Sequence, residues 1–279
     1  MLNQRWNNRR DSYRPSGEVI DTRLYEVSSL DEANAKAFVI TNHYSGSYPA
    51  ARFRFGLYRG DQLCGTAVFS HPCNDLVLTN VFRCDATNAV ELGRFVLLDS
   101  VAANGETWFL GRCFESLRKH DLNGVTTFSD PVPRRAADGR LVHPGHIGTI
   151  FQAFNGAYLG RGTPRTLRLL PDGRVLSDRA IQKIRAGERG WRYAARLLEE
   201  AGATAPDGDR VAWLKLWLPR LTRTVRHPGN HRYAWPLNKV ASRLMPQTYA
   251  YPKFSPLFPE LTVRNKYLDQ GEGAWRGVL

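Results

Sequence analysis

Short polar segments along this sequence combine side chains that can move protons. His43 and Tyr44 stand side by side, and an imidazole next to a phenol offers a base near neutral pH and a ring for stacking or proton transfer. Ser129 and Asp130 follow the predicted strand Val125–Phe128 (VTTF), which places them just past its end. These residues are the candidate catalytic groups. Without further evidence, His43 and Tyr44 could equally be an ordinary pair of loop residues, and Asp130 could equally be a residue that caps a turn.

A second group of residues is suited to hold an anion at the start of a helix. Asn104 and Gly105 precede the helical pattern Thr107–His120, where backbone N–H groups and the helix dipole favour phosphate. His146 lies just before the predicted helix Gly148–Asn155, and Gly148 is the first residue of that helix. The amino end of a helix disfavours a positively charged histidine and exposes backbone N–H donors. For His146 the alternative is a simple capping role.

The segment Arg226–Trp235 gathers planar, cationic and aromatic side chains around the turn signal Pro228–Gly229. Such side chains hold phosphates and extruded bases. The residues predicted to bind DNA are Arg226, His227, Asn230, His231, Arg232 and Tyr233. The alternative is a solvated basic turn whose aromatic residues anchor the tail.

Metal ligands are sparse in the sequence. His71 and Cys73 are two candidate ligands, and two do not make a site. The four cysteines form no Cys-x-x-Cys pair, which favours reduced thiols over a disulfide scaffold or a zinc knuckle. Trp213 and Trp217, one helical turn apart, are predicted to be core residues. The identity of any metal is left unknown.

The elements that must position these residues are short strands and helices separated by turn signals. Strands are predicted at Arg52–Arg59, Leu63–Ser70, Leu76–Phe82, Glu91–Asp99, Val125–Phe128 and Ala157–Leu159, and helices at Asp31–Val39, Thr107–His120 and Gly148–Asn155. From residue 91 onward, strands alternate with helices, which implies parallel neighbours joined by a helix. This order predicts an α/β layer whose ligands bind at the carboxyl ends of the strands.

The pattern changes after Gly160. Helices are predicted at Asp178–Arg185 and Trp191–Gly202, Asp207–Pro219 fits a helix or a strand, and a tail rich in proline and aromatic residues follows. We expect a flexible N-terminal arm at 1–17, an α/β core at 18–165, and a basic C-terminal extension at 166–279 that packs on the core and contacts DNA.

Composition narrows the class of protein. With 42% hydrophobic residues among 279, the chain can bury a core, and no run of about 18 apolar residues predicts a membrane span. The N-terminus lacks the apolar stretch of a secretory signal, so a cytoplasmic location is expected. The net charge of +13 is concentrated, since residues 161–239 hold 17 Lys and Arg against 7 Asp and Glu. Such a local surplus favours a polyanionic partner.

The segment Val90–Arg161 resembles the GCN5-related N-acetyltransferases (GNAT) in the order and spacing of its elements. In that family a strand ends at the acyl-CoA site, a helix follows, the next strand splays away, and a short helix closes the site. GTIFQAFNGAYLGR stands in the place of the closing helix and last strand, whereas SVAANGETWFLG replaces the family's pyrophosphate loop. The resemblance implies a GNAT-like mixed sheet flanked by helices, with acetyl-CoA or a related acyl-CoA as cofactor.

Four motifs resemble the phage Mom proteins, a divergent branch of that fold which modifies adenine in phage DNA. They are NHYS at Asn42–Ser45, ELGRF at Glu91–Phe95, FSDP at Phe128–Pro131 and GHIGTIFQA at Gly145–Ala153, in the family's order. The resemblance implies transfer of an acyl-derived group, methylcarbamoyl or acetamido, to the N6 amine of adenine in double-stranded DNA. This modification would protect phage DNA from restriction in the cytoplasm of the bacterial host.

The resemblance also carries over to single residues. Arg94 matches the strand arginine linked to acyl-CoA binding, and Asp130 matches an acidic residue at the active edge. His43 and Tyr44 match the family's early His-Tyr pair. Phe151 stands where the family usually has a tyrosine that is a candidate general acid or iron ligand, so iron is implied only by the resemblance.

Two other functions stay open. An acetyl-CoA-dependent N-acetyltransferase could act on a small amine or peptide, and a DNA-binding protein could retain a decayed transferase core. The expected partner is DNA with its target adenine flipped out, because the N6 group is hydrogen-bonded inside the duplex. No membrane partner is expected, and the sequence does not indicate an oligomeric state.

Overall fold

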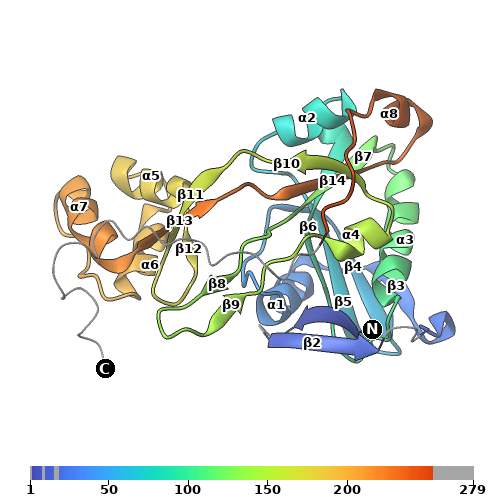
Figure 1. Ribbon diagram of the computed structural model, residues 1–279, viewed down its shortest axis with the longest axis horizontal. Coiled ribbons are helices and arrows are strands. Elements are labelled where there is room, and N and C mark those ends of the chain that lie inside the picture. Colours follow the sequence, from blue (N-terminus) through green and yellow to red (C-terminus); the bar gives the residue numbers. More distant parts are fainter. Residues whose placement is uncertain (1, 8–9, 16–18, 254–279) are drawn as a thin grey trace. The chain divides into compact units, whose positions relative to one another are not determined.

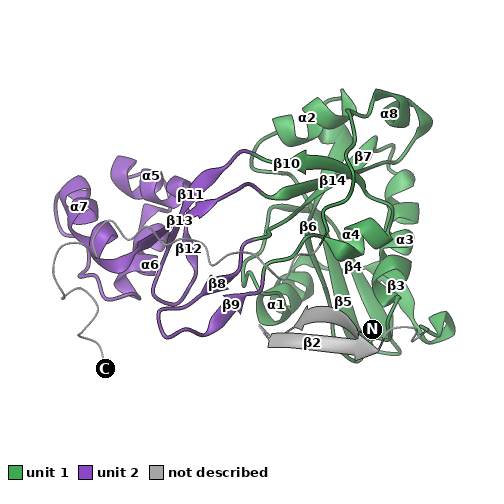
Figure 2. Cartoon of the chain, in the orientation of Figure 1, with its two compact units in different colours: residues 1–131, 145–162, 230–253 green, residues 132–144, 163–229, 254–279 purple. Residues whose placement is uncertain are grey.

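A computed structural model describes residues 2–7, 10–15 and 19–253, with side chains from residue 19 to residue 253. The chain forms two compact units, each assembled from separate stretches of sequence (Figure 2). Unit 1 contains residues 1–131, 145–162 and 230–253, and the described part of unit 2 contains 132–144 and 163–229. Unit 2 is therefore inserted within unit 1.

The centre of unit 1 is a seven-stranded mixed sheet with the strand order β10-β14-β7-β6-β5-β4-β3 (Figure 1). Its strands are β3 (Glu26–Ser29), β4 (Ala51–Arg59), β5 (Gln62–Ser70), β6 (Ala89–Leu97), β7 (Gly124–Ser129), β10 (Ala157–Arg161) and β14 (His231–Pro236). β6 and β7 run parallel, and the other neighbours run antiparallel. A parallel pair needs a crossover connection, which a helix between β6 and β7 supplies.

Helices cover both faces of this sheet (Figure 1). They are α1 (Glu32–Asn42), α2 (Leu76–Phe82), α3 (Gly105–Arg118), α4 (Thr149–Ala153) and α8 (Lys239–Leu244), with 3-10 turns η1 (Thr22–Leu24) and η2 (Ala86–Asn88). Val39 of α1 packs with Val68 of β5. Phe114 of α3 packs with Phe69 of β5, with ring centroids 6.1 Å apart. Because successive side chains of a strand point to opposite faces, α1 and α3 cover different faces.

The structure confirms the predicted α/β class, and the elements predicted between residues 31 and 161 are present with one exception. Leu76–Phe82, predicted as a strand, is helix α2. Its buried residues Leu78, Val81 and Phe82 recur at helical spacing. The backbone N–H of its first residue, Leu76, donates a hydrogen bond to Asn74 Oδ1 at 3.0 Å. A short apolar run is compatible with the periodicity of a helix and with that of a strand, so packing against the rest of the protein determines which one forms.

Unit 2 has a sheet and a core of its own. Its elements are β8 (Arg134–Arg135), β9 (Leu141–His143), β11 (Arg165–Leu169), β12 (Val175–Leu176), β13 (Arg223–His227), α5 (Asp178–Ala186), α6 (Trp191–Glu199) and α7 (Arg210–Leu221). The predicted helices α5 and α6 are confirmed, and the ambiguous segment is helix α7, capped by Asp209. Trp213 lies in the core and Trp217 packs against it, as predicted.

The division of the chain differs from the expected linear order. The chain enters unit 2 at residue 132, returns to unit 1 at residue 145, and enters unit 2 again at residue 163. It returns to unit 1 at residue 230, so β14 and α8 belong to unit 1. The segment expected to be a flexible arm contains β1 (Leu2–Asn7) and β2 (Arg10–Pro15), which pair antiparallel. Within the described residues, the helices are too short or too polar to cross a membrane.

Candidate active site

The two central strands of unit 1 separate part way along their length. Backbone pairing between β6 and β7 ends at Glu91 and Thr126, after which β6 continues along β5 and β7 along β14. Just past this point, Thr127 Oγ1 donates a hydrogen bond across the gap to the Leu92 carbonyl at 2.9 Å. The predicted parting of the central strands is confirmed, and it opens the sheet where candidate side chains gather.

Three loops of unit 1 meet at this opening. The phenol of Tyr44, which follows α1, lies 3.4 Å from Nε2 of His146, which precedes α4. The backbone N–H of His146 donates to the Asp130 carbonyl just after β7, at 2.8 Å. The structure thus brings together Tyr44, Asp130 and His146, which lie far apart in the sequence.

His43 is buried beside this group and its ring orientation is fixed. Its Nδ1 accepts the backbone N–H of Ser45 at 3.1 Å and lies 2.9 Å from the Ser45 hydroxyl. A ring nitrogen that accepts an N–H carries no proton, so neutral His43 has its hydrogen on Nε2. The rings of His43 and Tyr44 stack at 4.2 Å, and Tyr44 therefore has a rigid neighbour.

Arg94 connects strand β6 to the loop that follows Tyr44. Its guanidinium donates to the carbonyl and the hydroxyl of Ser47, each at 2.8 Å, and to the Gly93 carbonyl. Burial lowers the pKa of Arg94, while the charges of Tyr44 and Glu91 oppose this shift. The arginine predicted to bind acyl-CoA thus also holds the Tyr44 loop in place.

Glu91 is a functional candidate that the sequence did not single out. It stands at the last paired position of β6, where the central strands part. Burial raises the pKa of the Glu91 carboxyl, and the positive charge of Arg94 opposes the shift in part. A carboxylate with a raised pKa at a strand opening is a stronger base than an exposed one. Its only sequence signal is an acidic residue inside the apolar run of β6.

Ser129 faces a histidine from the neighbouring strand. Ser129 and His231 are direct partners in the β7–β14 register, and both are buried. Among the described residues, Ser129 Oγ and His231 Nε2 have no hydrogen-bond partner, whereas His231 Nδ1 lies 2.8 Å from the Tyr158 hydroxyl. Burial, followed by the charges of Arg161 and His146, lowers the pKa of His231 to about 4. The imidazole is therefore neutral at physiological pH.

Helix α4 carries Phe151 at the position where the resemblance to the Mom proteins predicts a tyrosine. Phe151 is buried against Tyr233 of β14, with ring centroids 5.6 Å apart. The Tyr233 hydroxyl donates to the Ile147 carbonyl and accepts from Gln152 Nε2 at 3.0 Å. Burial raises the pKa of Tyr233 to about 12, so its phenol stays protonated. Gly148 caps α4 at φ 78°, and a Cβ there would meet the Tyr233 ring at 2.7 Å.

The other residues predicted to bind the cofactor lie at the start of α3. Asn104 caps this helix in the left-handed conformation at φ 68°, and Gly105 is its first residue. A Cβ on Gly105 would meet Val101 Cγ1 at 2.6 Å, which explains the glycine. Hydrogen bonds join Arg94 to the loop after Tyr44, and the His146 ring lies next to the Tyr44 hydroxyl. Asn104 and Gly105 lie at the amino end of α3 and take no part in these contacts.

The residues predicted to bind DNA do not form one surface turn. Arg226 and His227 end β13 in unit 2, and Asn230 precedes β14 in unit 1, which carries His231, Arg232 and Tyr233. The three rings of this set, His227, His231 and Tyr233, are buried. Both arginines are exposed, and Arg232 donates to the Leu159 carbonyl at 2.6 Å. Stacking of bases on these rings would require them to leave the interior.

The described side chains do not fit the iron implied by the resemblance. Between residues 19 and 253, no group of three or more His, Cys, Asp or Glu side chains is arranged to hold a metal ion. Phe151 also lacks the donor atom that a tyrosine would offer at its position. We therefore derive no chemical step through a metal.

These features define an α/β protein with a GNAT-like order of elements: antiparallel strands, a parallel pair joined by α3, the closing helix α4, and the paired strands β10 and β14. The family model described as the Mom protein family matches residues 24–253. The chain thus belongs to the Mom protein family. No curated protein matches it in sequence.

Solved structures with a similar outline are acetyltransferases. An N-acetyltransferase from Staphylococcus aureus Mu50 is 9% identical, with 76% of this chain and 97% of that chain covered and a TM-score of 0.34. A putative acetyltransferase from Salmonella typhimurium with acetyl-CoA is 10% identical, with 77% and 95% covered and a TM-score of 0.37. A Bacillus subtilis acetyltransferase in complex with CoA is 8% identical, with 77% and 98% covered and a TM-score of 0.37. Likenesses this distant say nothing about substrates.

Proposed function

We propose that the chain transfers an acyl-derived group, of the methylcarbamoyl type, from an acyl-CoA to the N6 amine of adenine in DNA. The observation that carries the proposal is the gathering of Tyr44, Glu91, Arg94 and His146 around the opening between β6 and β7, in a member of the Mom protein family. Protection of phage DNA from restriction is the biological role that this chemistry would serve.

The chemistry sets two demands on the site. The N6 lone pair is delocalised into the adenine ring, so the amine must be oriented and must lose a proton as the new bond to nitrogen forms. The bond between the acyl carbon and the CoA sulfur then breaks, and the CoA thiolate leaves and takes up a proton. The adduct is the group that the donor already carries, so an acetyl donor gives an acetylated amine and a methylcarbamoyl adduct requires a methylcarbamoyl donor. Glu91 is our first choice for the proton acceptor, because burial raises its pKa toward the working range. Asp130 is the second choice, since its backbone already positions His146.

The remaining residues have supporting roles in this proposal. Neutral His43 holds the Tyr44 ring, and Arg94 holds the loop behind it. Tyr44, through His146, can donate or accept a hydrogen bond as charge develops on the acyl oxygen. The amino end of α3, a 14-residue helix, suits the pyrophosphate of the donor.

Unit 2 is the proposed DNA-binding part. Its described residues hold 17 Lys and Arg against 8 Asp and Glu. Cations that neutralise phosphates release counterions, which supplies affinity without sequence preference. The target adenine would be flipped out of the duplex to reach the reactive groups of unit 1.

The test is to express the chain, digest the cellular DNA and measure the mass of its nucleosides, with a Glu91→Gln variant as the matched control. A new adenine adduct that is absent from the variant supports the proposal. Unmodified DNA together with acetylated small amines or peptides would replace it with a plain acetyltransferase. DNA binding without either product would indicate a non-catalytic protein.

A further inference from the structure

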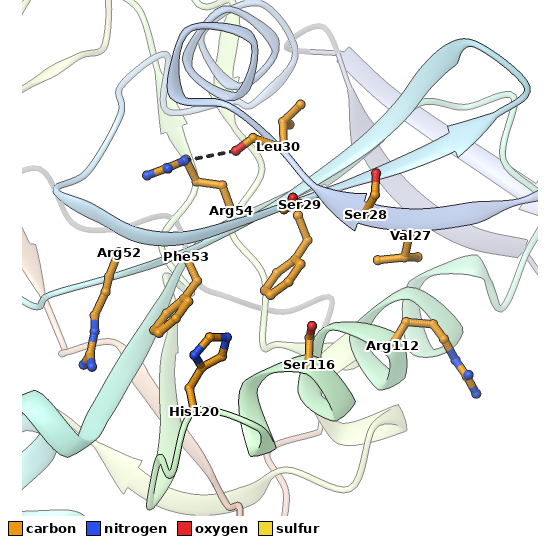
Figure 3. Close-up of a pocket in the computed structure, with 11 residues that line it drawn as sticks. Val27, Ser28, Ser29, Leu30, Arg52, Phe53, Arg54, Arg112, Ser116 and His120 are labelled. Atoms are coloured by element: carbon orange, nitrogen blue, oxygen red, sulfur yellow. Dashed lines mark hydrogen bonds between the residues drawn. The ribbon is translucent and has the colours of Figure 1, made fainter.

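Unit 1 has a pocket outside the candidate active site, between the edge of the sheet and α3 (Figure 3). Its volume is about 370 Å³, within the range of small-molecule sites. Its lining includes side chains from β3, β4, the carboxyl half of α3 and the turn that follows α3: Ser29, Arg52, Phe53, Arg112, Ser116 and His120. None of the candidate catalytic or cofactor-binding residues lines this pocket.

The lining of the pocket supplies hydrogen-bond donors and positive charge but no carboxylate. It contains arginine, serine and histidine side chains, and neither Asp nor Glu. Arg52 donates to the carbonyl oxygens of Thr87 and Ala89, so within residues 19–253 its charge is not met by an acidic group. Arg112 pairs at 3.0 Å with Glu115, a solvent-exposed ion pair of small energy. Such a lining favours an anion and disfavours a metal cation.

The pocket also offers aromatic surface. The ring of Phe53 lies 4.9 Å from that of His120, and the Arg52 guanidinium lies 5.1 Å from the Phe53 centroid. Figure 3 shows the rings of Phe53 and His120 side by side, with the Ser116 hydroxyl apart from them on α3. The Arg52 and Arg112 guanidiniums lie on opposite sides of the pocket, and Arg54 turns away to the Leu30 carbonyl. Flat rings flanked by a guanidinium are the usual platform for a nucleobase.

We propose that this pocket binds a nucleotide. The base would stack on Phe53 and His120, beside the Arg52 guanidinium. The phosphate would take hydrogen bonds from Ser116 and from Arg112, which lies one helical turn before it. A bare phosphate would fill only a small part of about 370 Å³ and would leave the aromatic surface unused. The same chemistry is present in a free nucleotide and in a nucleotide of a DNA strand. The inference is independent of acyl transfer.

The test compares variants on a single helix. Arg112→Ala removes a pocket arginine, whereas Arg118→Ala removes an exposed arginine of α3 that does not line the pocket. Ser116→Glu places a carboxylate where the phosphate is expected. Probes are dAMP and a short oligothymidylate, binding is measured by titration, and the imidazole NMR signals of His120 report the local contact. Circular dichroism and the melting temperature verify that each variant is folded.

We expect Arg112→Ala and Ser116→Glu to weaken binding while Arg118→Ala leaves it unchanged, and His120→Ala to cost about 5- to 100-fold through lost stacking. Losses with both probes indicate that a free nucleotide suffices, and losses with the oligonucleotide alone indicate a nucleotide of a strand. Equal effects of Arg112→Ala and Arg118→Ala, or a His120 signal that does not respond to either probe, would overturn the proposal. Adenine modification is not measured here, so that result would leave the proposed function standing.

Discussion

The two units of this chain differ in how they use charge. The described residues of unit 1 hold 18 Lys and Arg against 14 Asp and Glu, whereas those of unit 2 hold 17 against 8. Unit 1 buries or partly buries its ionisable candidates, so their pKa values are shifted by their surroundings. Unit 2 exposes most of its arginines, where they are available to phosphates. The comparison separates a part suited to chemistry from a part suited to holding a polyanion.

The way unit 2 joins unit 1 makes this separation possible. The longer of the two stretches of unit 2, residues 163–229, leaves unit 1 after β10 and returns at β14, and these two strands pair with each other. Inside unit 2 the adjoining strands β11 and β13 pair as well. An insertion whose two ends are already neighbours adds surface with little disturbance of the sheet that receives it. Basic residues can therefore accumulate in unit 2 without interrupting the seven-stranded sheet of unit 1.

The largest effect is expected from Glu91→Gln, which tests the chemical side of the comparison. Loss of the proton acceptor should reduce adenine modification by about 100- to 10,000-fold, while DNA affinity stays the same. Because the carboxylate form is the active base, wild-type activity should fall as pH drops through the raised pKa of Glu91. Initial rates measured from acidic to neutral pH verify this acidic limb.

Asp130→Asn is the matched control for that experiment. If Asp130 accepts the proton, this variant and not Glu91→Gln should abolish the acidic limb of the rate profile. A Glu91→Gln protein that modifies adenine at the wild-type rate would remove Glu91 from the mechanism. The two variants thus decide between the two carboxylates of the opening.

The next effect concerns unit 2. Changing the exposed residues Arg185, Arg189 and Arg196 together to Ala should reduce the slope of log affinity against log salt by about 0.9 for each lost phosphate contact. The matched control changes the exposed residues Arg59, Arg118 and Arg243 of unit 1, which should leave the slope near its wild-type value. Equal slope changes in both triple variants would show that the two units do not differ in DNA binding.

A smaller effect is expected from Tyr233, which the sequence assigned to base stacking. Its side chain is fully buried in the main core of unit 1. Tyr233→Ala should cost about 3–5 kcal/mol of stability, and Tyr233→Phe, which loses only the hydroxyl contacts to Ile147 and Gln152, about 1–3 kcal/mol. Chemical denaturation measures both. A stable Tyr233→Ala protein with weakened DNA binding would restore the stacking role.

The sequence predicted best what short-range patterns encode. The turn signals, the helical stripe of α3 and the order of elements from β6 to β10 led to the right fold class. Asp130 was placed correctly just past the end of β7, whereas Ser129 is the last residue of that strand. These features depend on neighbours a few residues away. The family motifs added the link between His43, Tyr44 and the later segments, which no local pattern contains.

What the sequence could not predict depends on long-range pairing. The polar and aromatic residues of β14 resemble a surface turn, but β14 lies between β7 and β10, and this pairing buries His231 and Tyr233. Glu91 was overlooked because its significance comes from the end of the β6–β7 pairing, a register that joins residues 35 positions apart. The nested division into two units escaped notice for the same reason.

The smallest expected effect is a pH dependence of stability that arises from His231. Its pKa in the folded protein, about 4, lies below the ordinary value of 6.5, so the unfolded chain takes up a proton first as pH falls. The stabilisation is present above pH 6.5 and is lost between pH 6.5 and about 4. In His231→Gln the melting temperature should fall less over this range, with each kcal/mol corresponding to about 2–4 °C. Parallel curves for the wild type and His231→Gln would show that His231 titrates in the folded protein as it does in the unfolded chain.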